Sequence, residues 1–396
     1  MTLLFGDHPD NQNNDSATAT PETKQHYEPE DLIPEITLSM VGGVGSMLTQ
    51  RLLNHFGDVE SILAASATRL QAVEGIGPKI ANSISLARSL CNAETLIDQC
   101  REHGISLIAK KDARYPALLR KIHDPPVFLF VKGGFQASDD LAIAIVGTRN
   151  MSPYGRKHAE RLAAELARSG FTIVSGLARG IDGAAHRGVL AAGGRTIAVL
   201  GSGLLNIFPP EHVQLADEVV EHGALVSEYV PEQRPDKGTF PQRNRIVSGL
   251  SLGVLIVEAP RKSGALITAS QAGEQGRDVF AMPGPVDHEA SRGCNRLIRD
   301  GAILVESADD ILEHLGPLVK PAQHPKHEAA TIRHPAELHL NEPETTVLQL
   351  VGVSSTPIDA IIVGSGLMPH QVIATLGVLE MRRLIRRGEA NTVVRV

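Results

Sequence analysis

Two arginines lie in glycine-rich turns that directly follow short apolar runs. Arg149 follows the run at 141–146, and Arg179 follows the run at 171–175. Glycines let backbone N–H groups approach an anion, helix N-termini favour negative charge, and arginine adds a two-pronged donor. These turns, with a third after the run at 196–200, therefore predict phosphate contacts from Gly147, Thr148, Arg149, Ser175, Gly176, Arg179, Gly201, Ser202 and Gly203.

A later segment combines cations with an aromatic ring. Residues 236–250 read DKGTFPQRNRIVSGL, with Phe240 at the start of a predicted helix. Cations for phosphates beside one ring for a base are expected of single-strand nucleic-acid binding. The alternative is that the ring is part of the core and the arginines form surface salt bridges. Taken alone, the segment leaves both open; the residues concerned are Lys237, Phe240, Arg243, Asn244 and Arg245.

Two more small-residue turns open helices further along the chain. Ser263, Gly264 and Asn295 are predicted to supply hydrogen bonds to a phosphate. Cys294 lies beside them, but no base accompanies it, so we expect a small packed residue rather than a nucleophile.

The elements that must position these residues repeat as strand, glycine turn and helix. Apolar runs without alternation are typical of strands buried on both faces, and this repeat predicts a parallel sheet covered by helices. Ligands bind such sheets outside the carboxyl ends of the strands, where the turns lie. The turn at 201–206 lacks the third glycine of GxGxxG, and no GxxxxGK[ST] occurs, so neither a dinucleotide site nor a P-loop is predicted.

The 396 residues divide into five predicted segments. They are an acidic disordered tail at 1–30, a helical, helix-hairpin-helix or SAM-like domain at 31–104, an extended Rossmann-like domain with a doubly wound, mostly parallel sheet at 105–316, a proline-rich linker at 317–342 and a winged-helix-like domain at 343–396.

Both end domains leave their role open. Residues 41–45 and 74–81 each resemble the hairpin of a helix-hairpin-helix motif, which either faces a DNA phosphate, with Lys79 adding charge, or only closes the domain. The C-terminal pattern predicts helices at 345–351, 357–363 and 369–384, followed by a basic hairpin. Arginines near the wing favour DNA, whereas an apolar recognition helix favours a protein partner. The arginines are Arg382, Arg383, Arg386, Arg387 and Arg395, and the apolar residues are Ile373, Leu376, Val378, Leu379 and Met381.

Composition limits the class of protein. The net charge is −7, of which the tail contributes −5, so DNA binding must come from a focused patch. Neither a membrane span nor a secretory signal is predicted. Three scattered cysteines indicate a reduced cytoplasm without structural zinc, and the four linker histidines do not suit one metal site.

The order of these motifs resembles a known family. GTR at 147–149, SGLARGIDGAAH at 175–186, GSG at 201–203 and FPQRNRIVSGLS at 240–251 are similar to motifs of the DprA/Smf family, the single-stranded-DNA-binding proteins of bacterial transformation. The resemblance covers the whole chain and is dense from about 141 to 302.

The resemblance implies a cytoplasmic, non-catalytic homodimer without cofactor or metal. Such a protein protects incoming single-stranded DNA, relieves inhibition by single-strand-binding protein and loads RecA recombinase during natural transformation. On this basis Arg149, Arg179, Lys237, Arg243 and Arg245 are expected to contact phosphates, and Phe240 to stack on a base.

An enzyme of the same architecture is the alternative. Nucleotide hydrolases such as the LOG phosphoribohydrolases share the Rossmann-like arrangement, and Asp182, His186 and Glu258 offer acid–base groups. The chain lacks the PGGxGT motif of that family. Asp182 and His186 have a structural interpretation too, in which Asp182 caps its helix and His186 packs.

Overall fold

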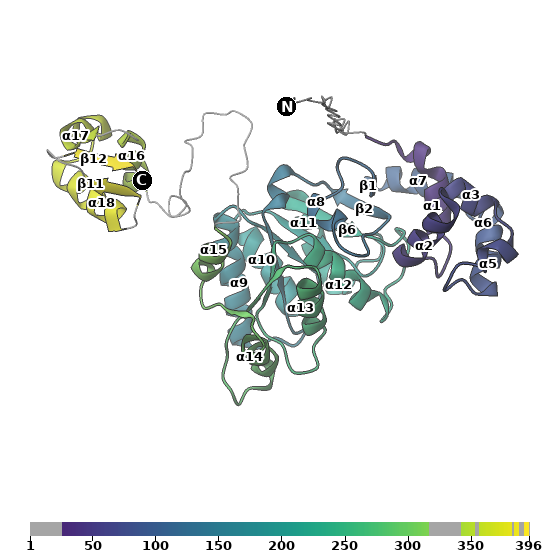
Figure 1. The fold of residues 1–396 in the computed structure, drawn as a ribbon. Coiled ribbons are helices and arrows are strands. Elements are labelled where there is room, and N and C mark those ends of the chain that lie inside the picture. The colour runs from purple at the N-terminus through teal and green to yellow at the C-terminus, as the bar shows by residue number, and fades with distance from the viewer. Residues whose placement is uncertain (1–25, 317–341, 353–355, 382–383, 388–391, 396) are drawn as a thin grey trace, which may run out of the picture.

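The computed structural model describes residues 26–316, 342–352, 356–381, 384–387 and 392–395. They form a small helical domain, a central domain built on one large sheet and a C-terminal domain (Figure 1). The predicted tail at 1–30 falls largely outside the described residues, and Pro29 already belongs to the first helical turn. The predicted linker lies outside them up to residue 341.

The N-terminal domain is entirely helical. Leu52, Ile62, Leu70 and Ile84 are fully buried in its own apolar core. Its two glycine hairpins connect α1 to α2 and α4 to α5. The elements are η1 (Pro29–Leu32), α1 (Ile33–Ser39), α2 (Ser46–Phe56), α3 (Val59–Ala64), α4 (Ala67–Leu70), α5 (Pro78–Ser85), α6 (Ala87–Leu90) and α7 (Ala93–Glu102).

The central domain holds a nine-stranded sheet in the order β1-β2-β6-β5-β4-β3-β7-β8-β9. In this spatial order, the seven strands β6-β5-β4-β3-β7-β8-β9 are parallel, and β1 and β2 add an antiparallel edge. The strands are β1 (Ile105–Ala109), β2 (Phe128–Gly133), β3 (Ala142–Val146), β4 (Thr172–Ser175), β5 (Thr196–Val199), β6 (Gly223–Ser227), β7 (Gly253–Ile256), β8 (Asp278–Ala281) and β9 (Ile303–Leu304).

Helices cover both faces of this sheet because successive side chains of each strand point to opposite faces. In β3, Ile143 and Ile145 pack under α9, α10 and α15, whereas Ala142 and Ala144 pack under α12 and α13. The helices are α8 (Ala117–Arg120), η2 (Ala137–Asp140), α9 (Pro153–Arg168), α10 (Ile181–Ala191), η3 (Pro210–His212), α11 (Val213–His222), α12 (Thr239–Gly249), α13 (Gly264–Glu274), η4 (Glu289–Ser291), α14 (Arg292–Arg299) and α15 (Ala308–Leu315).

The C-terminal domain packs three helices on a small sheet in the order β10-β12-β11, the arrangement of a winged helix. The third helix ends at Met381 rather than at the predicted residue 384, and Leu384 is buried beyond it. The elements are α16 (Glu342–Leu350), β10 (Thr356–Pro357), α17 (Ile358–Ser365), α18 (Pro369–Met381), β11 (Ile385–Arg387) and β12 (Thr392–Arg395).

The predicted fold class is confirmed: a Rossmann-like, mostly parallel sheet with an N-terminal helical domain and a C-terminal winged helix. Of the predicted wing arginines, Arg382 and Arg383 lie outside the described residues. Among the described residues, no single helix has the length and apolar character needed to cross a membrane. Of the helices that the structure describes, only α17 and α18 taken together reach that threshold, and they are bent by 115°.

Candidate nucleic-acid interface

The predicted turns meet where the strand order reverses, between β3 and β7, which is the usual ligand position in sheets of this kind. The Thr148 N–H donates to the Glu258 carbonyl at 2.7 Å, and the Ile181 N–H donates to the Thr148 carbonyl at 3.2 Å. A side chain at Gly180 would place its Cβ 2.1 Å from that same carbonyl oxygen. The turns after β3, β4 and β7 therefore interlock and hold Arg149 at the carboxyl edge of the sheet.

Arg149 and Phe240 form the centre of this edge. The guanidinium carbon of exposed Arg149 lies 5.1 Å from the centre of the half-buried Phe240 ring, within the range of a cation–π contact. The ring can lie here because residue 201 is a glycine: a Cβ at Gly201 would come within 2.8 Å of the ring. Arg149 forms no ion pair with another described residue, so its charge is available to an anion.

Lys237 adds a second exposed charge three residues before Phe240. It lies in the loop that leads from β6 into α12. That loop is ordered by Asp236, whose carboxylate accepts the Gly238 N–H at 2.8 Å, and by Thr239, whose hydroxyl donates to the Asp236 carbonyl at 2.8 Å. Within the described part of the chain, Lys237 has no ion-pair partner.

Sequence reasoning missed Phe208. Its half-buried ring lies 5.6 Å from that of Phe240, centre to centre, with the planes tilted by 48°. Arg179 lies over the Phe208 ring, with its guanidinium carbon 5.9 Å from the ring centre, and its Nη2 donates to Glu211 at 3.0 Å. The available signal was an aromatic residue five positions after Gly203, directly before the prolines at the start of η3.

The glycine turns leave less open space for a phosphate than predicted. A Cβ would come within 2.8 Å of Ile181 at Gly147, of Arg243 at Gly176, of Phe240 at Gly201 and of the Val230 carbonyl at Gly203. These glycines are thus needed because the protein itself fills the space beside them. Gly264 alone among the predicted glycines has no other atom within 4 Å of a built Cβ.

Arg243 is a correction to the predicted phosphate contacts. Its side chain is buried, with 3% of the residue exposed, and it donates to the carbonyls of Gly176, at 2.7 Å, and Val199. Burial lowers its pKa to about 10, against the opposing charge of Asp182. The guanidinium therefore supports the turns after β4 and β5 from below, and the predicted direct contact does not fit.

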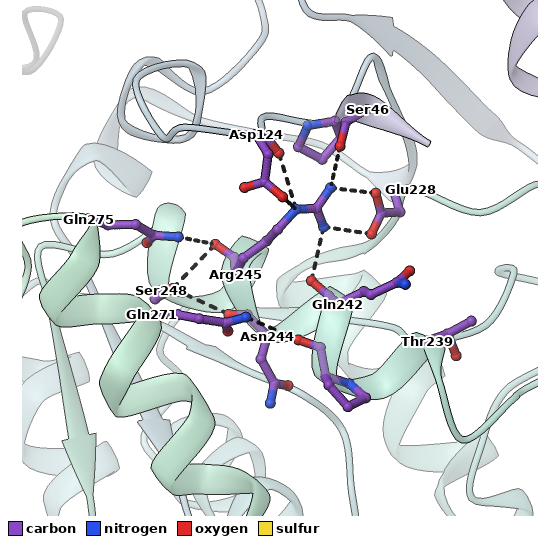
Figure 2. Close-up of polar contacts among 12 residues, drawn as sticks. Ser46, Asp124, Glu228, Thr239, Gln242, Asn244, Arg245, Ser248, Gln271 and Gln275 are labelled. Atoms are coloured by element: carbon purple, nitrogen blue, oxygen red, sulfur yellow. Dashed lines mark hydrogen bonds and ion pairs between the residues drawn. The ribbon is translucent and has the colours of Figure 1, made fainter. Parts of the chain in front are cut away.

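Arg245 is a second correction. Its two terminal nitrogens donate to the two Glu228 carboxylate oxygens, each at 2.7 Å, and its Nε lies 2.8 Å from Asp124 (Figure 2). The ion pair with Glu228 raises its pKa despite burial. It also reaches Ser46 Oγ at 3.5 Å, at the start of α2. Arg245 thus joins the helical domain to the central domain, and no donor is left for a phosphate.

Three more predicted side chains are used internally. Ser175 donates to the Ile145 carbonyl at 2.6 Å, Ser202 donates to the Asn206 carbonyl at 2.7 Å, and Asn295 donates to the Gly284 carbonyl at 2.9 Å while accepting its N–H. Each organises a turn, so the predicted phosphate contacts of these side chains are corrected too.

The remaining predicted residues stay at the carboxyl edge. Ser263 caps α13 by accepting the Ala265 N–H at 3.3 Å, and Asn244 donates to the Gly264 carbonyl at 3.4 Å. Thr148 is buried, and its hydroxyl oxygen accepts the Asn150 N–H at 3.2 Å. These contacts fix the turns on either side of Arg149 and Phe240.

The acid–base candidates of the enzyme alternative are not exposed. His186 is fully buried, and burial lowers its pKa to about 3. Asp182 accepts the Gly176 N–H at 3.1 Å, and burial raises its pKa. Glu258 accepts the N–H and hydroxyl of Ser152, at 2.9 and 2.5 Å, at the start of α9. All three have structural partners and none faces an open site.

Cys294 is likewise buried, 3.6 Å from the Ile256 carbonyl, and burial raises its thiol pKa to about 12. A thiol that stays protonated is a poor nucleophile. No group of three or more metal-ligating side chains occurs among the described residues, and the linker histidines lie outside them.

Comparison with known families assigns all three domains. A family model described as DNA recombination-mediator protein A matches residues 106–316. A helix-hairpin-helix motif matches residues 40–86, and a DprA winged helix domain matches residues 331–391.

Homologous proteins extend the match over most of the chain. Protein Smf of Synechocystis is 40% identical over 294 residues, covering 73% of this chain and 74% of its own. Protein Smf of Escherichia coli is 41% identical over 300 residues, covering 75% and 77%. The crystal structure of DNA processing protein A from Streptococcus pneumoniae, 34% identical, superimposes with a TM-score of 0.63 over 73% of this chain and 98% of that one.

Proposed function

Because the chain belongs to the DprA/Smf family, we propose that it is a non-catalytic recombination mediator that binds single-stranded DNA at the carboxyl edge of its central sheet. One observation carries the proposal of the site. An exposed, unpaired guanidinium lies over an aromatic ring at the strand-order reversal, in Arg149 and Phe240. A cation for a phosphate beside an aromatic ring for a base is the combination expected of single-strand binding.

The single strand is favoured over a duplex by the geometry of the rings. Phe240 is half-buried and its neighbour Phe208 is tilted against it by 48°. The bases of a duplex are stacked in parallel and paired along their edges, whereas an unpaired strand can turn each base onto a separate ring.

The cellular role proposed from family membership is more specific. The protein protects incoming DNA in the cytoplasm during natural transformation, relieves inhibition by single-strand-binding protein and loads RecA. It acts as a homodimer through the central domain. Arg149, Arg179 and Lys237 contact phosphates, with Asn244, Ser263 and Gly264 beside them, and Phe240 stacks on a base.

Fluorescence anisotropy with labelled oligo-dT and a matched duplex tests the site. We expect the wild type to prefer the single strand, and Arg149→Glu and Lys237→Glu to weaken binding at least tenfold, because each places a carboxylate where a phosphate binds. Arg168→Glu is the matched control, because it makes the same charge change on an exposed residue at the far end of α9, at the opposite edge of the sheet.

Each result decides something different. Equal losses in all three variants would show a general effect of charge and refute the site. Binding unchanged by the first two would move DNA to an end domain. No binding by the wild type would refute single-strand binding altogether. Release of base from nucleoside monophosphates by wild type and not by Glu258→Gln would replace the proposal with the enzyme alternative.

A further inference from the structure

The carboxyl edge carries two rings and two arginines in a chain of pairwise contacts. Arg149 lies over Phe240, Phe240 contacts Phe208, and Arg179 lies over Phe208. The members come from the turns after β3, β4 and β5 and from the start of α12. Each ring thus has its own guanidinium, and the Phe208 half repeats the chemistry of the Phe240 half.

The two halves differ in the state of the arginine. Arg149 has no ion-pair partner among the described residues, whereas Arg179 donates through Nε and Nη2 to both carboxylate oxygens of Glu211. Arg179 and Glu211 are each about half exposed, at 54% and 50%. Water and ions reach such a pair, so it is weak and can be exchanged for another anion.

We propose that Phe208 and Arg179 form a second nucleotide step beside the Phe240–Arg149 step. Phe208 stacks on the base of an adjacent nucleotide, and Arg179 leaves Glu211 to bind its phosphate. Glu211 competes with the DNA for Arg179 and so sets the affinity of this step. The inference rests on the proposed single-strand binding of the same edge and adds Phe208 and Glu211 to it.

Charge and geometry both support this assignment. Glu211 is kept ionised by Arg179, which lowers its pKa to about 2. An ionised carboxylate beside a phosphate track opposes the strand unless its arginine is shared, so removing it strengthens binding. A guanidinium that moves from a ring face to a phosphate also uncovers that face for a base, and bases stack on aromatic rings in single-strand sites.

Two variants test the step from opposite directions. Phe208→Leu should weaken oligo-dT binding about tenfold, with Phe135→Leu as the matched control, because Phe135 is also half-buried but precedes η2 at the opposite edge of the sheet. Glu211→Gln should strengthen binding about threefold to tenfold at low salt. In an Arg179→Gln background the same Glu211→Gln change should strengthen binding less than it does in the wild type, because it relieves only the repulsion of the strand and no arginine remains to be released.

Phe240→Leu separates this inference from the proposed function. If Phe240→Leu weakens binding while Phe208→Leu and Glu211→Gln bind as the wild type does, the second step is refuted and the first one stands. If Phe240→Leu also binds normally, the whole edge is excluded as the DNA site. Weaker binding by Glu211→Gln would refute competition, and it is decisive even where Phe208→Leu proves unstable, because Glu211 lies on the surface.

Discussion

Two of the four arginines predicted to bind phosphates are exposed and two are buried, and the two pairs have different roles. Arg149 and Arg179 project from turns at the carboxyl edge, each over an aromatic ring. Arg243 and Arg245 lie six and eight positions after Lys237 in the same motif, yet both are at least 93% buried. The former are available to a ligand, and the latter hold the turns and domains that present it.

The helical period accounts for the difference. In α12, Phe240 and Arg243 are three positions apart and share a face toward the sheet edge, whereas Arg245 is turned toward Glu228 and the N-terminal domain. A buried guanidinium must satisfy its donors within the protein. Carbonyls and carboxylates do so here, which leaves these two residues without capacity for DNA.

The largest expected effect separates stability from binding. Arg245→Met should lower the free energy of unfolding of the central domain by about 3 kcal/mol, because it leaves the mostly buried Glu228 carboxylate unpaired. Urea denaturation measures it. Adding Glu228→Gln should recover most of the loss, since the buried charge is then removed as well.

Arg149→Met is the matched exposed change and should alter the free energy of unfolding by less than about 0.5 kcal/mol. The contrast between buried and exposed arginines fails if the two single variants are equally stable. It also fails if Arg245→Met keeps its stability and loses only DNA binding.

The sequence predicted the fold and the location of the site better than the role of each side chain. Apolar runs and glycine turns identified the parallel sheet, and the edge of that sheet brought Arg149 near Phe240. Arg243 is buried against Val199, which is 44 positions away in the chain, and Arg245 against Asp124, which is 121 positions away. No local sequence pattern encodes such distant contacts. Phe208 was missed for the same reason, because its neighbour Phe240 is far along the chain.

The buried His186 of α10 should make the stability of the fold depend on pH. Thr196 donates to the Ile173 carbonyl at 2.7 Å, so His186 Nδ1, 2.8 Å away, is assigned as the donor to Thr196, and its Nε2 has no partner in the described part of the chain. Below pH 6.5 the unfolded chain binds a proton that folded His186 does not take up until about pH 3. Its contribution is therefore present above pH 6.5 and is lost as pH falls toward 3.

Between pH 7 and pH 5 the wild type should lose about 2 kcal/mol of unfolding free energy more than His186→Gln does. Urea denaturation at the two pH values measures the difference. Asp182, whose pKa is raised by burial, acts in the opposite direction but is present in both proteins and cancels. Equal losses in the two proteins would show that His186 is accessible to protons in the fold and would reopen an acid–base role for it.

The smallest effect is the most direct comparison of an exposed with a buried cation. Each phosphate contact on a single strand contributes about 0.7 to the slope of log affinity against log salt concentration. Lys237→Gln should therefore reduce that slope by about 0.7, because Lys237 is exposed and unpaired within the described residues.

The double variant Arg245→Met with Glu228→Gln should keep the wild-type slope. The Arg245 guanidinium that it removes is paired with Glu228 and Asp124 in the wild type rather than with a phosphate. Anisotropy titrations at four salt concentrations resolve the two slopes. A reduced slope in the double variant would mean that Arg245 exchanges its carboxylates for DNA, as we propose for Arg179, and the distinction between the two groups of arginines would then lie in their exposure in the free protein alone.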